Sequence, residues 1–402
     1  MKCCYLLMLS LLSMWMLVPH SATAQQFERD EKAMIENFKG LQYMLKDSTF
    51  YINFRFRMQN RLGYYSKSAT DLNVDRWEAR VRRLRLRFDG FVLTKKLAYS
   101  IQLSFSRGDQ DAENTGVANI VRDAVIYYKP NPKLHFAFGL NKLPGNRQRV
   151  NSSGQLQFAE RSIVNSALTL DRDFGIKVYY YGNIGNFLYN LKGAISTGEG
   201  RSPIFTSAGL AYTGRVEFLP LGKFKDDGDY SEGDLEREPT PKLSIAAGYS
   251  YNHKSSRSGG QLGKELYEER SMGTIIVDMC FKYRGWAYNA EFLKRTVNNP
   301  YTMNDQGDVR YAYAGQGTNH QVSYCFPRMY EIAFRYSWLD PAKSISTSEK
   351  IKEILELGAT KYLRKHRIKV QLSTFYDIRG HDYSIHNPKN SWGGLFQVEL
   401  GI

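Results

Sequence analysis

The chain contains few cysteines and, beyond its first residues, no long hydrophobic run. Of its 4 cysteines, Cys3 and Cys4 precede an apolar stretch near the N-terminus, which leaves Cys280 and Cys325 for the rest of the chain. Two cysteines are too few for a disulfide framework, and their spacing is not that of zinc ligands. The later chain has no run of about 18 apolar residues, the length that a membrane-spanning helix needs. The fold must therefore depend on its own backbone pairing and packing.

Motifs of enzyme active sites are also missing. The histidines are scattered, and the sequence contains neither a nucleophile elbow nor a His-Glu-x-x-His metal site. Glu160 together with Asp171 or Asp173 could be imagined as an acid-base pair, although charged pairs are common in surface loops. We therefore expect no catalytic residue, no metal site and no cofactor.

The first residues are typical of an export signal. Lys2 supplies a short positive region, residues 5–18 are mainly apolar, and the small residues 22–24 form a cleavage site. We predict a signal peptide over 1–24 and a periplasmic N-terminal tail over 25–48, in which residues 27–46 have loosely helical apolar spacing.

Positive charge exceeds negative charge along the chain. Lys and Arg total 55 against 40 Asp and Glu, which gives a formal net charge of +15. Such a balance indicates an anionic partner, or a positive surface that only aids solubility. Because an exported protein meets little nucleic acid, we do not expect nucleic acid to be that partner.

Aromatic residues are abundant, at 14% of the chain, and they recur with period two. From Phe50, apolar residues alternate with polar ones that include Arg55 and Arg57. Alternation of this kind places the two sets on opposite faces of a strand. A transmembrane β-barrel needs this pattern and aromatic girdles, so it explains how a polar sequence can lie in an outer membrane.

The run over residues 78–89 alternates basic and apolar side chains with one irregularity. As a strand, it places Arg83, Arg85 and Arg87 on one face and apolar side chains on the other. A basic amphipathic helix is the alternative, but it would place Leu86 on the charged face. We predict a strand, with a β-bulge at Arg82 and Arg83 that resets the alternation.

Further alternating segments extend to the C-terminus. They predict an all-β fold, a transmembrane antiparallel β-barrel of about 16 strands over residues 49–402, with both ends on the periplasmic side. A long loop occupies 141–172, and long loops are usually functional or disordered. The acidic segment 220–241 falls where a short periplasmic turn is expected, and is therefore the weakest point of the strand assignment.

The sequence resembles the phosphate-selective porins O and P, in forms found in Bacteroidetes-type outer membranes. The similar motifs are Arg-Arg-Leu-Arg-Leu-Arg-Phe-Asp-Gly at 82–90, Arg-Asp-Ala-Val-Ile-Tyr-Tyr-Lys-Pro at 122–130, and the segments 139–144, 158–175 and 331–337. The resemblance implies a homotrimer of sixteen-stranded barrels whose third outer loop folds inward to narrow the pore. That loop would be 141–172. The chain departs from the family in ending at Ile402 rather than at an aromatic residue.

Two groups of cations follow as candidate site residues. Because a lipid-facing Arg near the bilayer midplane costs about 2 to 4 kcal/mol, basic side chains should face the lumen. The expected pore-lining, anion-binding residues are Arg55, Arg57, Arg80, Arg82, Arg83, Arg85 and Arg87. The expected constriction-loop residues are Lys142, Arg147, Arg149, Arg161 and Arg172.

The predicted function is a water-filled outer-membrane channel for passive diffusion of small anions, with phosphate as a candidate solute. Clustered guanidinium groups in a narrow channel attract anions and offer forked donors to phosphate or carboxylate. A general, non-selective porin is the alternative if these arginines mainly pair with lumen acids such as Glu78 and Asp89. The arginines of the loop 141–172 could equally pair with lipopolysaccharide or with acids of the barrel wall, and outer-membrane lipid is the expected surrounding of the barrel. An exported all-β enzyme or glycan-binding protein remains the alternative from another class.

Overall fold

The computed structural model describes residues 40–111, 116, 118–201, 203 and 208–402, and in it most of the chain forms long antiparallel strands. The predicted signal peptide 1–24 and most of the predicted tail 25–48 lie outside the described residues. Sixteen strands form the wall: β2 (Phe50–Ser66), β3 (Val74–Val92), β4 (Thr94–Ser104), β5 (Val121–Tyr128), β6 (Leu134–Lys142), β7 (Arg172–Ile184), β8 (Phe187–Ser196), β9 (Ala211–Leu219), β10 (Lys242–Arg257), β11 (Glu265–Tyr283), β12 (Trp286–Val297), β15 (Gly315–Cys325), β16 (Tyr330–Pro341), β17 (Lys352–Arg364), β18 (Ile368–Arg379) and β19 (Ser391–Gly401).

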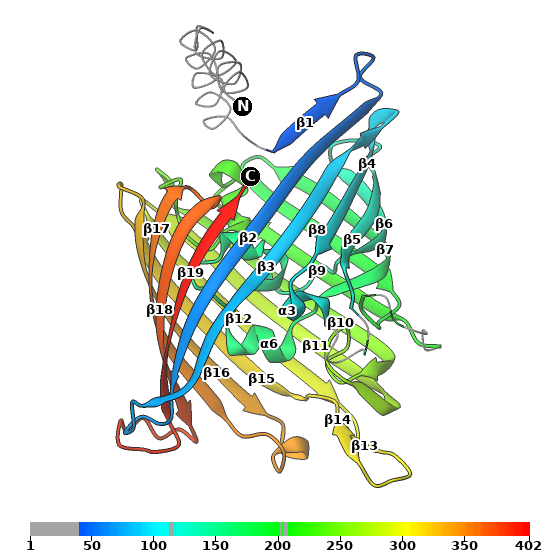
Figure 1. The fold of residues 1–402 in the computed structure, drawn as a ribbon. Coiled ribbons are helices and arrows are strands. Elements are labelled where there is room, and N and C mark those ends of the chain that lie inside the picture. The colour runs from blue at the N-terminus through cyan, green and yellow to red at the C-terminus, as the bar shows by residue number, and fades with distance from the viewer. Residues whose placement is uncertain (1–39, 112–115, 117, 202, 204–207) are drawn as a thin grey trace, which may run out of the picture.

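The wall closes on itself, as Figure 1 shows. Each strand pairs antiparallel with its neighbour along the chain, and β19 completes the ring by pairing with β2, from Gly393 opposite Tyr65 to Gly401 opposite Arg57. The all-β fold class and the count of sixteen strands are therefore confirmed. Both ends of the described chain lie at one end of the barrel, here called the terminal end. The other is called the loop end.

A few short elements lie outside the ring or within its loops. Strand β1 (Leu41–Met44) pairs with the beginning of β2, so this part of the expected tail is extended rather than helical. Strands β13 (Tyr301–Met303) and β14 (Val309–Tyr311) form a hairpin at the loop end, and short helical turns occur at α3 (Arg107–Gln110) and η4 (Lys343–Ile345). No helix in the described ranges has the length and apolar character needed to cross a bilayer.

Side chains alternate across the wall because successive residues of a strand point to opposite faces. On β9, Tyr212 and Phe218 are exposed on the outer face, whereas Thr213, Arg215 and Glu217 are buried on the inner face. An apolar outer surface and a polar interior result, as a barrel in lipid requires.

The predicted irregularity in the basic run is a β-bulge in the structure. Gln59 of β2 pairs with Arg83 of β3, but the next residue, Asn60, pairs with Val81, so Arg82 is the extra residue. The prediction of a strand with a bulge at Arg82 and Arg83 is confirmed. The bulge keeps Val81 and Leu84 on the outer face, while the side chains of Arg82 and Arg83 both point into the lumen.

The loop between β6 and β7 folds into the barrel. Its limits are 143–171 rather than the predicted 141–172, because Lys142 ends β6 and Arg172 begins β7. The loop contains α5 (Arg147–Val150), η2 (Ser153–Gln155) and α6 (Ile163–Leu168). Side chains of α6 pack against inward apolar residues of the wall, in a cluster made of Leu143, Val164, Leu168, Leu170, Ala194, Ile276, Leu293 and Leu339.

The segment 220–241, between β9 and β10, also enters the barrel, although it starts from the terminal end. It contains η3 (Lys225–Tyr230). Glu232 joins it to the loop and the wall: its carboxylate accepts hydrogen bonds from the Gln157 backbone N–H (2.8 Å) and from Gln321 Nε2 of β15 (3.0 Å). The strand count survives the unusual length of this segment because the additional residues fill part of the lumen instead of forming another strand pair.

Candidate functional site

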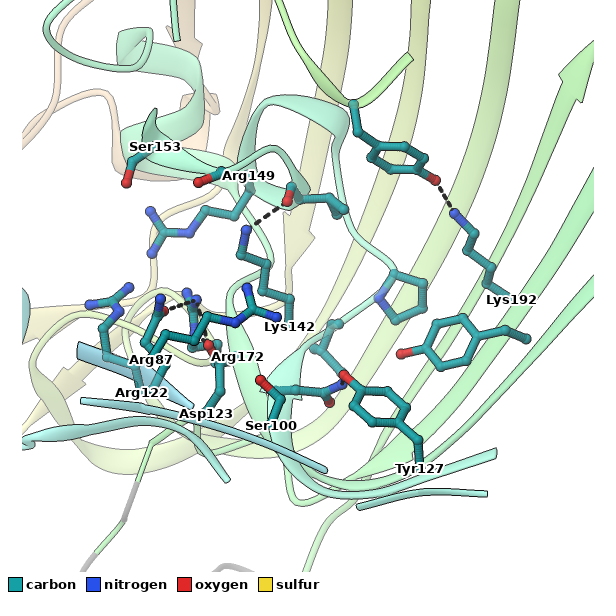
Figure 2. A pocket seen from close by; sticks show the side chains of 18 of the residues that line it. Arg87, Ser100, Arg122, Asp123, Tyr127, Lys142, Arg149, Ser153, Arg172 and Lys192 are labelled. Atoms are coloured by element: carbon teal, nitrogen blue, oxygen red, sulfur yellow. Dashed lines mark hydrogen bonds and ion pairs between the residues drawn. The ribbon is translucent and has the colours of Figure 1, made fainter. Parts of the chain in front are cut away.

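A cavity of about 430 Å³, here called the central cavity, lies between the inner face of β2 to β9 and the loop 143–171. Its lining contains eleven basic side chains and two carboxylates, Asp123 and Glu217. The basic side chains are Arg57, Arg85, Arg87, Arg122, Lys129, Lys142, Arg149, Arg161, Arg172, Lys192 and Arg215. Several of them point toward the same space in Figure 2.

A second cavity of about 680 Å³, here called the terminal cavity, adjoins the central cavity. It extends to the terminal end of the barrel, where Gln42 and Ile402 line it. Arg57, Arg85 and Arg87 belong to the lining of both cavities, as do Gln102 and Ser152. These arginines therefore lie where a solute would pass from one cavity into the other.

The strand register brings the predicted pore-lining arginines together. Arg55 pairs with Arg87 across β2 and β3, and Arg57 pairs with Arg85. The loop lies against this group: Arg57 donates to the hydroxyls of Ser152 (3.0 Å) and Ser153 (2.7 Å). Arg85 donates to the same Ser153 hydroxyl at 2.9 Å. We call a group of arginines on β2 and β3 the ladder: Arg55, Arg57, Arg61, Arg80, Arg82, Arg83, Arg85 and Arg87. The ladder thus holds the inner tip of the loop.

The part of the ladder nearer the loop end is neutralised by loop acids. Arg82 and Arg83 contact the Glu160 carboxylate at 3.1 and 3.4 Å, and Arg61 forms a further ion pair with it. Burial by itself would raise the pKa of Glu160, but the neighbouring guanidinium groups of Arg82, Arg83 and Arg61 hold it well below its usual range. Of these three arginines, none lines either cavity.

Other ladder residues also have acidic partners. Arg80 donates to Glu78 at 2.9 Å, and both Arg55 and Arg87 form ion pairs with Asp89. The alternative that lumen acids neutralise arginines therefore describes part of the ladder. The other acids, Glu160 and Asp109, come from loops, and the sequence contains no signal that pairs them with these arginines.

The cations at or near the inserted loop differ in their partners. Arg147 donates to Asp278 of the wall at 2.8 Å and faces away from the central cavity, while Arg149 contacts Asp171 at 2.6 Å. Arg172 pairs with Asp123 at 2.9 Å. All three form these ion pairs inside the barrel.

Lys142 and Arg161 contrast with those three. Lys142 Nζ donates to the carbonyl oxygens of Val150 (2.6 Å) and Asn151 (3.2 Å), and Arg161 donates to those of Gln148 (2.7 Å) and Asn151 (3.0 Å). Within the described part of the chain, neither has a carboxylate at ion-pair distance. Burial and the nearby Arg149 lower the pKa of Arg161 well below its usual range. Among the described residues, both cations therefore lack the carboxylate partner that Arg147, Arg149 and Arg172 have.

Sequence reasoning missed four basic residues of the cavity: Arg122, Lys129, Lys192 and Arg215. It also missed its tyrosines, Tyr127, Tyr179, Tyr181 and Tyr230. The parity of the alternation could have placed the strand residues among them inward. Tyr230 carries no such signal, because it belongs to the inserted segment 220–241.

Solved structures share this architecture. The anion-selective porin from Comamonas acidovorans superposes with a TM-score of 0.55 at 13% identity, covering 88% of this chain and 100% of that one. OmpF of Salmonella typhi in complex with daunomycin gives a TM-score of 0.55 at 11% identity, with coverage of 90% and 100%. The outer membrane channel DcaP of Acinetobacter baumannii gives 0.53 at 12%, with coverage of 90% and 99%. At these identities the likeness shows the fold alone.

A closed barrel with a loop in its lumen is the architecture of outer-membrane porins, which are channels rather than enzymes. Residues 52–305 match the family model described as phosphate-selective porin O and P, and the chain belongs to that family. Among curated proteins, none matches the sequence significantly. The exported enzyme or glycan-binding protein is therefore excluded as the class of this chain.

Proposed function

We propose that the protein forms a water-filled channel through which small anions, phosphate among them, diffuse passively. The observation that carries this proposal is the lining of the central cavity, where eleven basic side chains face two carboxylates. In a narrow space with low-dielectric walls, such an excess concentrates anions and repels cations.

Most cavity cations pair with carboxylates, but the partners of three of them favour this function over a non-selective pore. Lys142 and Arg161 are held by backbone carbonyl oxygens, and Arg57 by serine hydroxyls, with Glu399 more distant at 3.8 Å. Neutral acceptors orient these cations without cancelling their charge. An anion can then exchange weakly between several sites, which conduction requires.

Three further proposals accompany this function: the chain is exported with residues 1–24 as signal peptide, residues 25–48 form a periplasmic tail, and the barrel assembles as a homotrimer in outer-membrane lipid. Family membership supports the trimer. Cross-linking of the detergent-extracted protein, followed by mass measurement, tests the trimer, and N-terminal sequencing tests the cleavage site.

The reversal potential in a KCl gradient across a planar bilayer tests the proposed selectivity. We expect anion preference, and we expect the double variant Arg57→Ala, Arg87→Ala to lose much of it because both side chains line both cavities. Arg80→Ala is the matched control, since Arg80 pairs with Glu78 and lines neither cavity. Cation preference in the unaltered protein would refute the proposal.

A further inference from the structure

The two sides of the central cavity differ in chemistry. Figure 2 shows Arg87, Arg122 and Arg149 on one side, and Tyr127 and Lys192 on the other. Tyr179 pairs with Lys192 in the strand register, and Tyr230 contacts Lys192, so both belong to this second side. Together with Tyr127 and Tyr181, four tyrosines line the cavity. A cavity that only selected for charge would not need this second wall.

Three of the tyrosines come from the barrel wall and are held in place. Tyr179 and Tyr181 are two residues apart on β7 and so share its inner face. The Tyr181 ring lies 5.2 Å from the ring of His135, and the Tyr127 hydroxyl accepts a hydrogen bond from Asn141 Nδ2 at 3.2 Å. These contacts fix the rings as a surface, with hydroxyl groups that can donate or accept.

Tyr230 reaches the same cavity from the segment 220–241. Its hydroxyl donates to the Glu217 carboxylate at 2.7 Å, and Lys192 contacts that carboxylate at 2.7 Å. Lys192 Nζ also lies 4.9 Å from the centre of the Tyr230 ring. Glu217 is thereby neutralised, so this side of the cavity is polar and aromatic but does not repel an anion.

The basic side retains unused donor capacity. The Arg122 side chain, only 5% exposed, contacts Asp109 through Nη1, and within the described chain its Nε has no hydrogen-bond partner. An inorganic anion can use such donors, but it makes no use of the aromatic side. A solute with an anionic group and a hydroxyl-bearing ring would use both.

We propose that the central cavity is a binding site for anionic monosaccharides, sugars that carry a phosphate or carboxylate group. The anionic group lies against Arg87, Arg122 and Lys142, and the sugar ring lies against Tyr127, Tyr179 and Tyr181. The volume of about 430 Å³ lies within the range of sites for small organic ligands. Guanidinium groups bind phosphate and carboxylate alike, and tyrosines offer aromatic faces together with hydroxyl groups. This inference rests on the proposed anion channel.

Block of chloride current in single channels tests the proposal. The solutes are glucose 6-phosphate, glucuronate, inorganic phosphate and glucose. We expect at least one of the two sugar acids to reach half-block at a concentration about tenfold below that of inorganic phosphate, with glucose weakest; a factor of ten corresponds to about 1.4 kcal/mol. The better of the two identifies the preferred anionic group. Equal potency of both sugar acids and phosphate would overturn the proposal.

Variants separate the tyrosine wall from the charge. Tyr179→Ala with Tyr181→Ala should weaken block by the sugar acids roughly threefold to tenfold. Block by inorganic phosphate should weaken by a smaller factor, so that the ratio of the half-block concentrations of phosphate and sugar acid falls. Tyr180→Ala is the matched control, because Tyr180 lies between these residues on β7 and faces outward.

Tyr179→Phe with Tyr181→Phe keeps the rings and serves if the alanine variant fails to fold. It should give a smaller loss of sugar-acid block, because only the hydroxyl contacts are removed. If the sugar acids block both variants as strongly as they block the unaltered channel, the tyrosines do not bind the sugar and the proposal is wrong. Anion preference in KCl would in that case still support the channel function. If the unaltered channel shows no anion preference in KCl, the proposed function itself is refuted.

Discussion

The inner face of β2 to β9, here called the open half, differs from the inner face of β10 to β18, called the filled half. The central cavity is lined by the open half, the inserted loop and Tyr230, and among the described residues none of β10 to β18 lines it. In the filled half, inward polar side chains such as Glu291, Gln321 and Glu331 are covered by the loop 143–171 and the segment 220–241. Both halves have polar inner faces, but among the described residues only the open half lines the central cavity.

The comparison separates the presence of a charge from its availability. Lys282 of the filled half donates to Gly228 O (2.7 Å), Ser231 Oγ (2.9 Å) and Gly233 O (2.6 Å) of the inserted segment. Arg335 is equally committed, since it donates to Glu356 at 2.6 Å and to Glu160 O at 3.0 Å. Buried charges whose donors are all hydrogen-bonded stabilise the fold. Lys142 and Arg161 differ because no carboxylate of the described residues neutralises their charge at the cavity.

Removal of the inserted segment 220–241, which covers part of the filled half, should change the difference between the two halves most. Replacement of residues 221–240 by a short turn should open the filled half and raise single-channel conductance severalfold, because pore cross-section limits ion flow. It would also give water access to Asp278 and Glu331, so anion preference should fall. Replacement of the hairpin loop 304–308 between β13 and β14 is the control and should leave conductance unchanged. Unchanged conductance in the first variant would mean that the segment does not block a path.

Replacement of one lysine in each half, Lys142 and Lys282, should have effects of intermediate size that differ between the halves. Lys142→Met removes a cavity charge that has no carboxylate partner in the described part of the chain, so we expect lower anion preference. It also removes the lysine donor from Val150 O, whereas Asn151 O keeps Arg161, so we expect a smaller loss of stability than at Lys282. Lys282→Met removes the cation that donates to Gly228 O, Ser231 Oγ and Gly233 O, and of their described contacts the two carbonyl oxygens then keep only the longer ones with Ser231, at 3.2 to 3.4 Å. Each buried acceptor left poorly satisfied costs about 1 to 3 kcal/mol. We therefore expect it to lower the temperature of the heat-induced mobility shift on gels and to leave the reversal potential nearly unchanged. The reverse pattern would contradict the division into halves.

The smallest effect should come from the acid that neutralises the ladder. The folded pKa of Glu160 is lowered, so its ion pairs stabilise the loop above the unfolded pKa and are lost only as pH falls through the lower folded value. Anion preference should stay constant through the usual glutamate range and rise slightly at still lower pH. Glu160→Gln should show that small rise already at neutral pH, while Glu268→Gln, at an exposed ion pair near the loop end, should not. A rise centred on the ordinary glutamate pKa would show that the arginines do not hold this carboxylate.

Much of the wall could be predicted because alternation is a local property. Residues 78–89 reveal strand, bulge and lumen face through their own order, and the register then follows from neighbouring strands. The partners within the lumen could not be predicted. Asp109 and Glu160 reach the ladder from separate loops, and their pairing with Arg85 and Arg82 depends on loop paths without periodicity.

The segment 220–241 shows where prediction stops. Its length and acidity marked it as unusual, but neither property indicates that Glu232 would join the loop to β12 and β15. Its entry into the lumen depends on contacts between residues far apart in the chain.

The amino-acid sequence by itself determined that this chain forms a closed, sixteen-stranded barrel with arginines on its inner face, because a period of two sorts side chains between lipid and water. Only the tertiary structure decided which arginines meet a solute. Arg57, Arg85 and Arg87 line both cavities, and of these Arg57 is held by serine hydroxyls whereas Arg85 and Arg87 pair with Asp109 and Asp89. Arg82 and Arg83 line neither cavity and pair with Glu160. The physical reason is that each residue type fixes its own charge. The neutralisation of that charge depends on which acid, far away in the sequence, lies within a few ångströms of it in the fold.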